Sequence, residues 1–526
     1  MDILAIIQGA FSPMVMLYAA LGVIIGVTAG AIPGISGTTV IALTIPFAFK
    51  MPSACALAFF IGCYKGSMFG GSISAISFGI PGTPAAVATC FDGVPARKKG
   101  KPRQALLTAL FSSVTGDITS DLVLIFLCMP LASIALKFGP SEFVALYVFS
   151  LLLVAVLTEG RASKAIVMMA LGLLLACIGS DPVTGTARFT FGIAKLRGGI
   201  NTVSLLIGMF AMSEVITQLY SEWLKVRGKK SNEPERKAVE IENYDPKKDK
   251  MTFKTYLSTL KSTFIGATVG TFVGTLPAAG SSLSALMSYG LARRFSKKPD
   301  EFGKGSLEGI AAPEAANSAT CGACFIPMFA FGIPGTTTAA LFMVALMMMG
   351  ISCGPNMLAE HGSVMYTFFV TMLYCNLFNL ICSYFLIPIY AKISQLPIRY
   401  LVPAVCVLAI IGGYAAQNSL FDVLLMLIFA FMGVYFKKHN FPTGPLILGF
   451  IIGSGLERSF SQVMSISAGN PMALFKSPIA IGIYVCGLLF MLLMLYFFKS
   501  SNKLKEEASQ NSEAGDEIEE VLSDEE

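Results

Sequence analysis

The amino-acid sequence predicts an all-α polytopic membrane protein, made of two inverted-topology repeats whose broken or re-entrant helices meet at a central site. Three observations lead to this prediction: the apolar composition, the apolar runs that recur along the chain, and two glycine–proline motifs that each occur twice. Of the 526 residues, 54% are hydrophobic and only 13% are charged. Soluble proteins carry about 25% charged residues, so this chain must place much of its surface in lipid.

Apolar runs supply the membrane-spanning elements, since several approach the roughly 20 residues that such a helix needs. They cover residues 15–32, 122–136, 143–157, 166–178, 203–216, 401–411, 423–434 and 479–498. Other runs are shorter or broken by Gly and Pro, and we expect on the order of 10 to 14 membrane segments. Residues 105–137 could cross the membrane once, or twice if Thr115-Gly116-Asp117 interrupts the helix.

Two motifs occur once in each half of the chain. The first is a glycine stripe that ends in proline, Gly22-x3-Gly26-x3-Gly30-Ala-Ile-Pro33 and Gly266-x3-Gly270-x3-Gly274-Thr-Leu-Pro277. The second is Phe78-Gly-Ile-Pro-Gly-Thr83, which matches Phe331-Gly-Ile-Pro-Gly-Thr336. Because both motifs recur in the same order, we interpret the halves as an internal duplication. Glycine stripes also allow helices to pack closely, and the two interpretations do not compete.

Basic loops indicate how the two halves lie in the membrane, since Lys and Arg accumulate in cytoplasmic loops. Residues 97–103 carry five basic side chains, whereas the equivalent stretch 350–356 of the second half has none. Residues 293–298 carry four, whereas their counterpart around Lys50 has one. Equivalent loops therefore fall on opposite sides of the membrane, as inverted repeats require.

The chain divides into four parts by composition. Residues 1–224 are the first transmembrane repeat and residues 254–498 are the second. The charged stretch 225–253 is predicted to be a cytoplasmic linker, and the acidic stretch 499–526 a disordered C-terminal tail. The positive charge outside that tail lies in loops, which suits anionic membrane lipid and not nucleic acid.

Helix breaks form the predicted substrate site. Pro removes a backbone donor and Gly lets the backbone bend, and a membrane tolerates unwound backbone only where protein buries it or a cavity borders it. Helix N-termini there present N–H groups and a positive dipole end to an anion. The predicted substrate-binding residues at the breaks are Pro33, Gly34, Ser36, Thr38, Pro81, Gly82, Thr83, Pro277, Gly280, Ser281, Ser282, Pro334, Gly335 and Thr336. Alternatively, each hydroxyl bonds to its own backbone in a kinked helix.

Polar side chains inside apolar stretches are the candidate coupling-ion ligands, because such residues are costly in lipid and mark functional sites. Glu314 and Asn317 are three residues apart, and Asp117 and Asp121 are four apart. Each pair can share a helix face and hold Na⁺ through oxygen atoms or relay a proton. Alternatively, Glu314 is a helix N-terminal carboxylate after Pro313, and the two aspartates mark a loop.

Lys65 is a cation within the apolar stretch 59–70. It could meet a substrate carboxylate or pair with an intramembrane acid, and we include it among the substrate-binding residues. No cofactor and no metal beyond Na⁺ is expected. The two His are too few for a metal site, and the single Cys321-Gly-Ala-Cys324 pair has no second pair beside it.

Together these motifs resemble the large membrane subunit of tripartite tricarboxylate transporters. The match covers nearly the whole chain up to about Gly469. The residues that carry it are Gly30-Ala-Ile-Pro-Gly34, Tyr64, Gly66, Gly70-Gly-Ser72, Gly79-Ile-Pro-Gly-Thr-Pro84, Phe91-Asp-Gly-Val-Pro95, Lys99-Gly100, Gly179-x-Asp181-Pro182-x-x-Gly185, 274–280, Phe302-Gly303-x-Gly305, Glu308-Gly309, Ala312-Pro-Glu-Ala315, Asn317, Gly332-Ile-Pro-Gly335 and Gly354-Pro355. Three positions depart from the family pattern: Ala278 replaces the usual Gly, Ser318 replaces the usual Asn, and Lys65 stands where a neutral residue is expected.

The resemblance implies a multi-pass protein of the bacterial inner membrane that imports di- or tricarboxylates on a sodium or proton gradient. It also implies two partners, a small four-helix membrane subunit and an extracytoplasmic solute-binding protein. Among the predicted site residues, it carries over the Pro-Gly breaks, Glu314 and Asn317. The chain is therefore expected not to be an enzyme.

Two other functions compete with this interpretation. A passive anion channel could be built from the same halves, although it would not need carboxylates for a coupling ion. An intramembrane hydrolase is suggested by Gly34-Ile-Ser-Gly37, which matches the GxSG of rhomboid-type proteases. That motif has no equivalent in the second half, and a serine nucleophile also needs a base such as His beside it.

Overall fold

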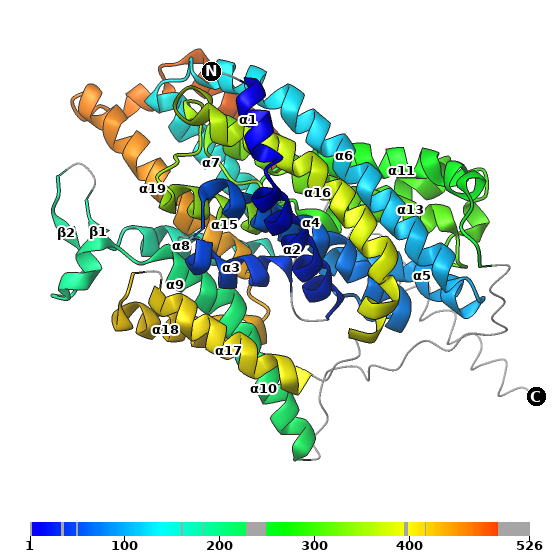
Figure 1. Cartoon of the computed structure of the whole chain (residues 1–526). Coiled ribbons are helices and arrows are strands. Elements are labelled where there is room, and N and C mark those ends of the chain that lie inside the picture. The colour runs from blue at the N-terminus through cyan, green and yellow to red at the C-terminus, as the bar shows by residue number, and fades with distance from the viewer. Residues whose placement is uncertain are drawn as a thin grey trace, which may run out of the picture.

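The computed structural model describes residues 3–32, 36–48, 51–158, 161–181, 184–227, 249–393, 398–415 and 417–492. Helices make up nearly all of this part of the chain (Figure 1). Six of them are long and apolar enough to cross a membrane, and five shorter apolar helices accompany them. The predicted all-α polytopic membrane fold is confirmed, whereas the inverted orientation of the halves stays a prediction.

The helices of the two halves follow one another in chain order. In the first half these are α1 (Ile3–Ala10), α2 (Pro13–Ala31), α3 (Gly37–Ala48), α4 (Ser53–Phe78), η1 (Pro84–Ala86), α5 (Val87–Lys98), α6 (Pro102–Ala135), α7 (Pro140–Leu157), α8 (Ala162–Ala176), η2 (Ala194–Gly198), α9 (Thr202–Leu206), the π-helical turn η3 (Ile207–Met212) and α10 (Ser213–Val226). In the second half they are α11 (Phe253–Gly274), α12 (Gly280–Phe295), η4 (Pro299–Glu301), α13 (Leu307–Ala323), α14 (Phe325–Phe331), α15 (Thr337–Met348), α16 (Met357–Ile393), α17 (Ile398–Ala415), α18 (Leu420–Lys438), α19 (Thr443–Ile466), η5 (Pro471–Phe475) and a helix over Pro478–Leu492.

The two glycine stripes pack against equivalent helices. A Cβ atom added to Gly26 of α2 would lie 2.3 Å from the carbonyl oxygen of Cys63 in α4. A Cβ atom added to Gly270 of α11 would lie 2.2 Å from the carbonyl oxygen of Ala316 in α13. Such distances leave no room for a side chain, so glycine allows each helix pair to approach backbone to backbone. Both copies of the stripe therefore build the same kind of helix pair.

The two copies of the second motif also fold alike. Gly79 ends α4 with φ +67°, and Gly332 ends α14 with φ +73°, a left-handed conformation that glycine adopts without a steric penalty. Beyond each glycine the chain turns back onto its own helix. The amide of Gly82 donates to the Gly71 carbonyl at 3.2 Å, and the amide of Gly335 donates to the Cys324 carbonyl at 3.3 Å.

The halves interlock, because the long helix of each half packs on the other half. α6 contacts α11 and α13, while α16 contacts α2 and α4. Likewise α8 lies against α19, and α18 lies against η3 and α10. Figure 1 shows α6 and α16 running side by side across the protein.

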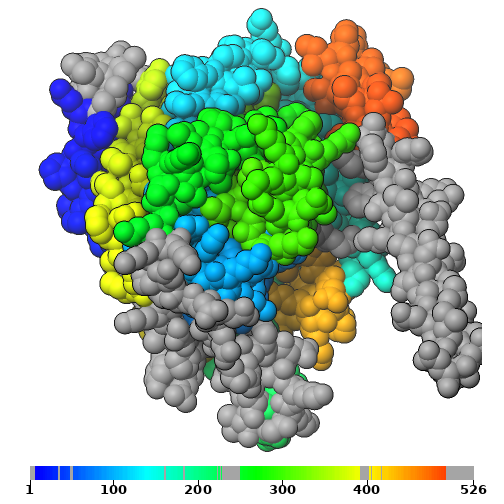
Figure 2. All heavy atoms as spheres, turned by 90° about the vertical axis from the view of Figure 1, so that its right-hand side faces the viewer, coloured from blue at the N-terminus to red at the C-terminus, as the bar shows by residue number. Residues whose placement is uncertain are grey.

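The first basic loop and the segment that follows the second basic loop meet on one face of the protein. The Lys99 ammonium donates to the Lys304 carbonyl at 2.6 Å. Nearby, the Asp92 carboxylate accepts the amides of Gly305 and Ser306, each at 2.7 Å. Figure 2 looks onto this face, where the end of α5 (blue) adjoins the segment after α12 (green). This arrangement fits the prediction that both loops are cytoplasmic.

The structure decides one open alternative and adds one feature that was not predicted. Residues 105–137 contain no interruption at Thr115-Gly116-Asp117, because α6 is one helix of 34 residues. A short antiparallel hairpin, β1 (Gly179–Ser180) with β2 (Ala187–Arg188), interrupts the otherwise helical chain. Several predicted features lie outside the described residues: Pro33, Gly34, Lys50, linker residues 228–248 and the whole acidic tail.

Candidate functional site

The structure brings the described helix breaks together. Within the second half, the Ala278 amide donates to the Gly335 carbonyl at 2.9 Å. Between the halves, the Thr38 hydroxyl lies 2.8 Å from the Thr338 hydroxyl, so the start of α3 meets the start of α15. Within the first half, a Cβ atom on Gly82 would lie 2.3 Å from the carbonyl oxygen of Gly30, which is three residues before Pro33 in the sequence. Pro33 and Gly34 themselves lie outside the described residues.

Apart from Thr38, which pairs with Thr338, the hydroxyls at these breaks fall into two groups. Ser36 and Thr336 accept hydrogen bonds from the amides of the residues three positions later, Thr39 and Ala339. They therefore satisfy helix N-termini, which is the alternative role that a hydroxyl near a break can take. The remaining hydroxyls, described next, have no such role.

Thr83 is the clearest of the free hydroxyls, because its oxygen is buried without a hydrogen-bond partner among the described residues. Ser281 and Ser282 lie in the first turn of α12, partly exposed, and no hydrogen bond involves their hydroxyls within the described chain. Gly280 precedes them with φ +71°. These three hydroxyls can donate to a bound anion without giving up an existing bond.

Glu314 lies in the middle of α13 and is fully buried. Its Oε1 atom accepts hydrogen bonds from the hydroxyls of Ser72 in α4, at 2.5 Å, and Thr89 in α5. Its Oε2 atom has no donor among the described residues. Glu314 is therefore in a helix interior and is not the N-terminal carboxylate of the alternative interpretation.

Asn317 lies one helical turn beyond Glu314 and is 1% exposed. Its amide nitrogen donates to the Met68 carbonyl at 3.3 Å, while its Oδ1 atom has no donor within the described chain. Buried polar atoms normally have partners. Two unpartnered oxygens on adjacent turns of one helix, Glu314 Oε2 and Asn317 Oδ1, can therefore hold a hard cation such as Na⁺, which prefers oxygen ligands.

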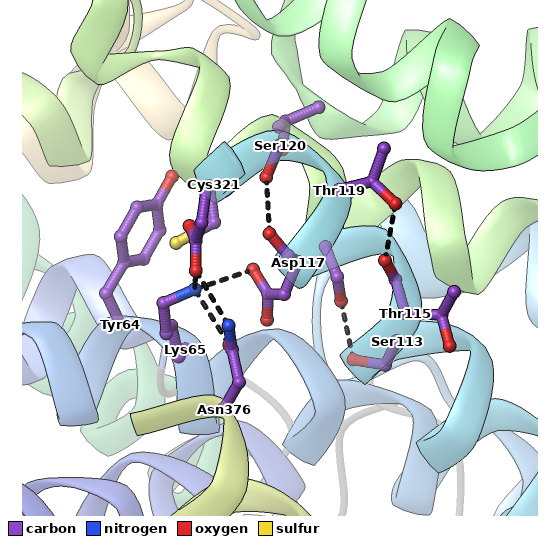
Figure 3. Close-up of polar contacts among 12 residues, drawn as sticks. Tyr64, Lys65, Ser113, Thr115, Asp117, Thr119, Ser120, Cys321 and Asn376 are labelled. Atoms are coloured by element: carbon purple, nitrogen blue, oxygen red, sulfur yellow. Dashed lines mark hydrogen bonds and ion pairs between the residues drawn. The ribbon is translucent and has the colours of Figure 1, made fainter. Parts of the chain in front are cut away.

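Lys65 lies within a second polar cluster (Figure 3). Its ammonium nitrogen is 3.2 Å from Asp117 Oδ1, 2.8 Å from Asp121 Oδ2 and 2.8 Å from Asn376 Oδ1. The amide nitrogen of Asn376 donates to Asp121 Oδ2 at 2.7 Å. Lys65 and both aspartates are fully buried. Lys65 thus pairs with intramembrane acids, one of the two roles considered for it, and the aspartates lie within a helix and not in a loop.

The two polar clusters share one face of α4. Lys65, Met68 and Ser72 are three and four residues apart, so they line one side of the helix, and that side contacts α6 and α13. The helix ends at the break that holds Gly82 and Thr83, which packs back on Gly71. The predicted ion ligands and the predicted substrate site are therefore connected through α4.

A pocket of about 460 Å³ opens beside the second-half break. Gly332, Asn356 and Arg458 are among its lining residues. Arg458 is exposed and forms no ion pair among the described residues. α6 separates this region from the basic loops by about 50 Å, at about 1.5 Å per helical residue, because Phe138 after its far end stacks on Phe331 of the break.

Comparison with known sequences decides the family. Residues 16–448 match the sequence model of the tripartite tricarboxylate transporter TctA family. The chain belongs to this family. It is a component of a tricarboxylate transporter that works with other subunits, and it is a multi-pass membrane protein.

Two Agrobacterium vitis proteins are similar to this TctA-family chain. One, described as an uncharacterized 52.8 kDa protein in the TAR-I ttuC' 3'region, is 34% identical over 481 residues, covering 91% of this chain and 93% of the relative. The other, an uncharacterized protein in the TAR-II ttuC' 3'region, is 34% identical over 226 residues, covering 43% of this chain and 93% of the relative. No solved structure matches the chain.

The three departures from the TctA-family pattern have visible consequences in the structure. Ala278, in place of Gly, takes φ +61°. Ser318, in place of Asn, shares a 2.6 Å hydrogen bond with the Ser113 hydroxyl of α6. Lys65 places a cation between two aspartates.

Four residues around these clusters were not predicted from the sequence: Ser72, Thr89, Asn376 and Arg458. Asn376 is an amide within the long apolar helix α16, so the criterion that selected Glu314 could also have selected it. Ser72 and Thr89 are small hydroxyls, which are common in membrane helices as backbone-bonded residues, and only the fold shows that they face Glu314.

Proposed function

We propose that this TctA-family subunit is a secondary active importer of di- or tricarboxylates, coupled to a sodium or proton gradient. The observation that carries the proposal is the pair of buried oxygens without donors, Glu314 Oε2 and Asn317 Oδ1. A cation or a proton bound there would supply the missing partner. A passive channel has no need for such a site, because its flux requires no exchange of energy with an ion gradient.

The substrate would bind at the converging helix breaks. A carboxylate that enters the membrane loses its water, so each oxygen needs a replacement donor. Thr83, Ser281 and Ser282 offer hydroxyls that are free to donate, and the helix N-termini of the breaks add backbone N–H groups. Neutral donors of this kind can release the anion again on the other side.

The cation would act on substrate binding through α4. Ser72 of this helix contacts Glu314, and the helix ends at the break that holds Thr83. Occupation of the cation site would therefore stabilise one position of that break. Such coupling is a difference in affinity between two conformations.

The expected partners are a small four-helix membrane subunit and an extracytoplasmic solute-binding protein in the bacterial inner membrane. A binding protein would deliver the carboxylate on the side opposite the basic loops. The pocket with Arg458 and Gly332 opens on that side, and its cation would attract the anionic substrate toward the second-half break.

Uptake into proteoliposomes tests the proposal. The chain and its membrane partner would be reconstituted, supplied with binding protein, and assayed with radiolabelled di- and tricarboxylates under a sodium gradient, a proton gradient or neither. We expect accumulation only with one of the gradients. Equilibration that ignores both gradients would identify a channel, and labelling of Ser36 by a serine-reactive probe would identify a hydrolase.

Substitution of Glu314 tests the cation site directly. Glu314→Gln removes the charge but keeps the shape, so gradient-driven uptake should fall by about tenfold or more, since a hydrogen bond or contact to a charged group contributes about 1.5–3 kcal/mol. Glu308→Gln, earlier in α13, is the matched control because Glu308 contacts Ser262 and not the site. If uptake by Glu314→Gln depends on the ion gradient as uptake by the wild type does, Glu314 is not a ligand of the coupling cation.

A further inference from the structure

The cluster around Lys65 has the ligand set of a cation site. Three oxygens converge on the Lys65 ammonium: one from each of Asp117 and Asp121 in α6, and one from Asn376 in α16. Carboxylate and amide oxygens are ligands that hard metal cations prefer. The second oxygen of each aspartate, Asp117 Oδ2 and Asp121 Oδ1, is buried with no donor among the described residues. The cluster can therefore offer more oxygens than the ammonium uses.

The two carboxylates of the cluster need a cation beside them. Two carboxylates and one ammonium are enclosed together, and the side chains of all three are 0% exposed. Removal of the ammonium alone would leave two buried carboxylates at close range, which is strongly unfavourable unless another cation or protons replace it. The Lys65 side chain thus performs the task that a bound ion performs in an acidic site.

We propose that the Lys65 ammonium is a built-in cation in a second cation site, and that a chain without this side chain binds one additional monovalent cation between Asp117 and Asp121. The inference rests on the proposed cation coupling at Glu314 and Asn317. It adds a site whose cation stays attached to the protein throughout the transport cycle. The residue at position 65 would then set how many cations are moved with each substrate.

The position of the cluster supports a role in transport. It joins α4 and α6 of the first half to α16 of the second half, so its occupant holds together elements of both halves. It also lies on the face of α4 that reaches Asn317 through the Met68 carbonyl and Glu314 through Ser72. A fixed cation here would hold α4 in place beside the proposed cation site at Glu314 and Asn317. The exchangeable cation could then bind and dissociate at that site without displacing α4.

A comparison of two Lys65 variants tests the proposal on the purified full chain. Lys65→Ala removes the ammonium and leaves space for an ion, whereas Lys65→Met removes the ammonium but fills the space. Binding of ²²Na⁺ and ⁸⁶Rb⁺ would be counted per chain, and thermal unfolding would be followed in Na⁺, K⁺ and methylammonium. We expect Lys65→Ala to bind one more cation than the wild type, and Lys65→Met to bind no more than the wild type.

Methylammonium restores the missing charge most closely, because it has the same head group as Lys65. It should raise the unfolding temperature of Lys65→Ala and leave that of the wild type unchanged. Lys65→Ala/Asp121→Asn lacks one carboxylate and should lose the additional cation. Lys65→Ala could fail to fold when no cation is added. In that case the proposal requires that Na⁺, K⁺ or methylammonium restores folded protein.

The outcomes separate this proposal from the proposed function. Equal cation counts for Lys65→Ala and the wild type, with unfolding that ignores all three cations, would show that the aspartates take up protons and that Lys65 is only a structural ion pair. Recovery by none of the cations would overturn the proposal in the same way. Wild-type uptake that does not depend on an ion gradient would instead contradict the proposed function. The difference in cation binding between Lys65→Ala and the wild type could still be measured in that case.

Discussion

At the scale of single residues, Ala278 shows a side chain in conflict with its backbone. Its φ of +61° lies in the left-handed region, where a non-glycine residue costs about 1–2 kcal/mol. The preceding proline and the hydrogen bond from its amide to Gly335 fix this conformation. The resemblance to the family led us to expect glycine at this position, and the left-handed backbone gives a physical reason for glycine there.

Ala278→Gly should therefore stabilise the protein. Glycine relieves the left-handed strain and loses about 0.4–1 kcal/mol through the greater freedom of the unfolded chain, so a net gain of about 1 kcal/mol is expected. Thermal unfolding in detergent measures it. Ala279→Gly is the control, because Ala279 has φ −61° and is buried, and this variant should be less stable than the wild type. A lower unfolding temperature for Ala278→Gly would contradict the assignment of strain.

Thr83 and Thr336 are equivalent in the two motifs, yet the structure gives them different tasks. Thr83→Val removes an unpartnered hydroxyl and should weaken carboxylate binding about tenfold with little change in stability, since a hydrogen bond to a charged group contributes about 1.5–3 kcal/mol. Thr336→Val removes the N-cap of α15 and should cost about 1 kcal/mol of stability.

Titration of each variant with candidate carboxylates, followed by thermal shift, separates the two effects. Thr83→Ser keeps the hydroxyl and should bind as the wild type does. Full ligand-induced stabilisation in Thr83→Val would show that this hydroxyl does not contact the substrate.

The sequence indicated which residues belong to the site more readily than what each one contacts. Glu314, Asp117 and Asp121 could be selected because ionisable groups are costly inside a membrane. The partner of Lys65 could not be decided between a substrate carboxylate and an intramembrane acid, because it depends on which helix faces α4. Neither Asp121 nor Asn376 is near Lys65 in sequence, and only the packing of α4, α6 and α16 brings them within 2.8 Å.

At the scale of elements, the sequence predicted the repeated motifs well and the helix lengths less well. The glycine stripes and the two Gly-Ile-Pro-Gly-Thr turns fold as equivalent pairs. In contrast, the sequence left residues 105–137 open between a single crossing and two crossings interrupted at Gly116, and the structure places Gly116 inside α6. A Cβ atom there would lie 2.2 Å from the Ala315 carbonyl oxygen. A glycine that ends a helix and one that admits a neighbouring helix cannot be distinguished without knowing the neighbour.

Gly270→Ala tests the importance of the glycine contacts. Its methyl group would lie 2.2 Å from the Ala316 carbonyl oxygen, so α11 must move away from α13, at a cost of about 1–3 kcal/mol. Because α13 carries Glu314, gradient-driven uptake should fall as well. Gly290→Ala in α12 is the matched control, since a Cβ atom there meets nothing within 4 Å. It should be neutral or stabilising, because alanine favours a helix over glycine by up to about 1 kcal/mol. Equal stability of the two variants would contradict the close approach.

At the scale of the whole molecule, the interlocked halves explain why the repeats cannot be two separate domains. Each long helix, α6 and α16, packs mainly on the other half, so neither half buries its own polar residues alone. The sequence predicted a duplication, but it did not predict that the long helix of each half packs on the other half. A repeat in sequence does not indicate which copy a helix packs against. The packing of each long helix on the other half also places both ion clusters at the boundary between the halves.

The inverted orientation of the halves makes a prediction about the two faces of the membrane. Lys99 and Lys304 lie together on the basic face, whereas Ser459 lines the pocket with Arg458 at the other end of α6. In a background without accessible cysteines, Lys99→Cys and Lys304→Cys should resist a membrane-impermeant thiol reagent applied to intact cells, and Ser459→Cys should react. Inside-out vesicles provide the control, because the pattern should reverse there. Ready labelling of either basic-loop variant from outside the cell would place those loops outside and contradict the inverted topology. That result would also remove the reason for assigning the Arg458 pocket to the side where a binding protein delivers the substrate.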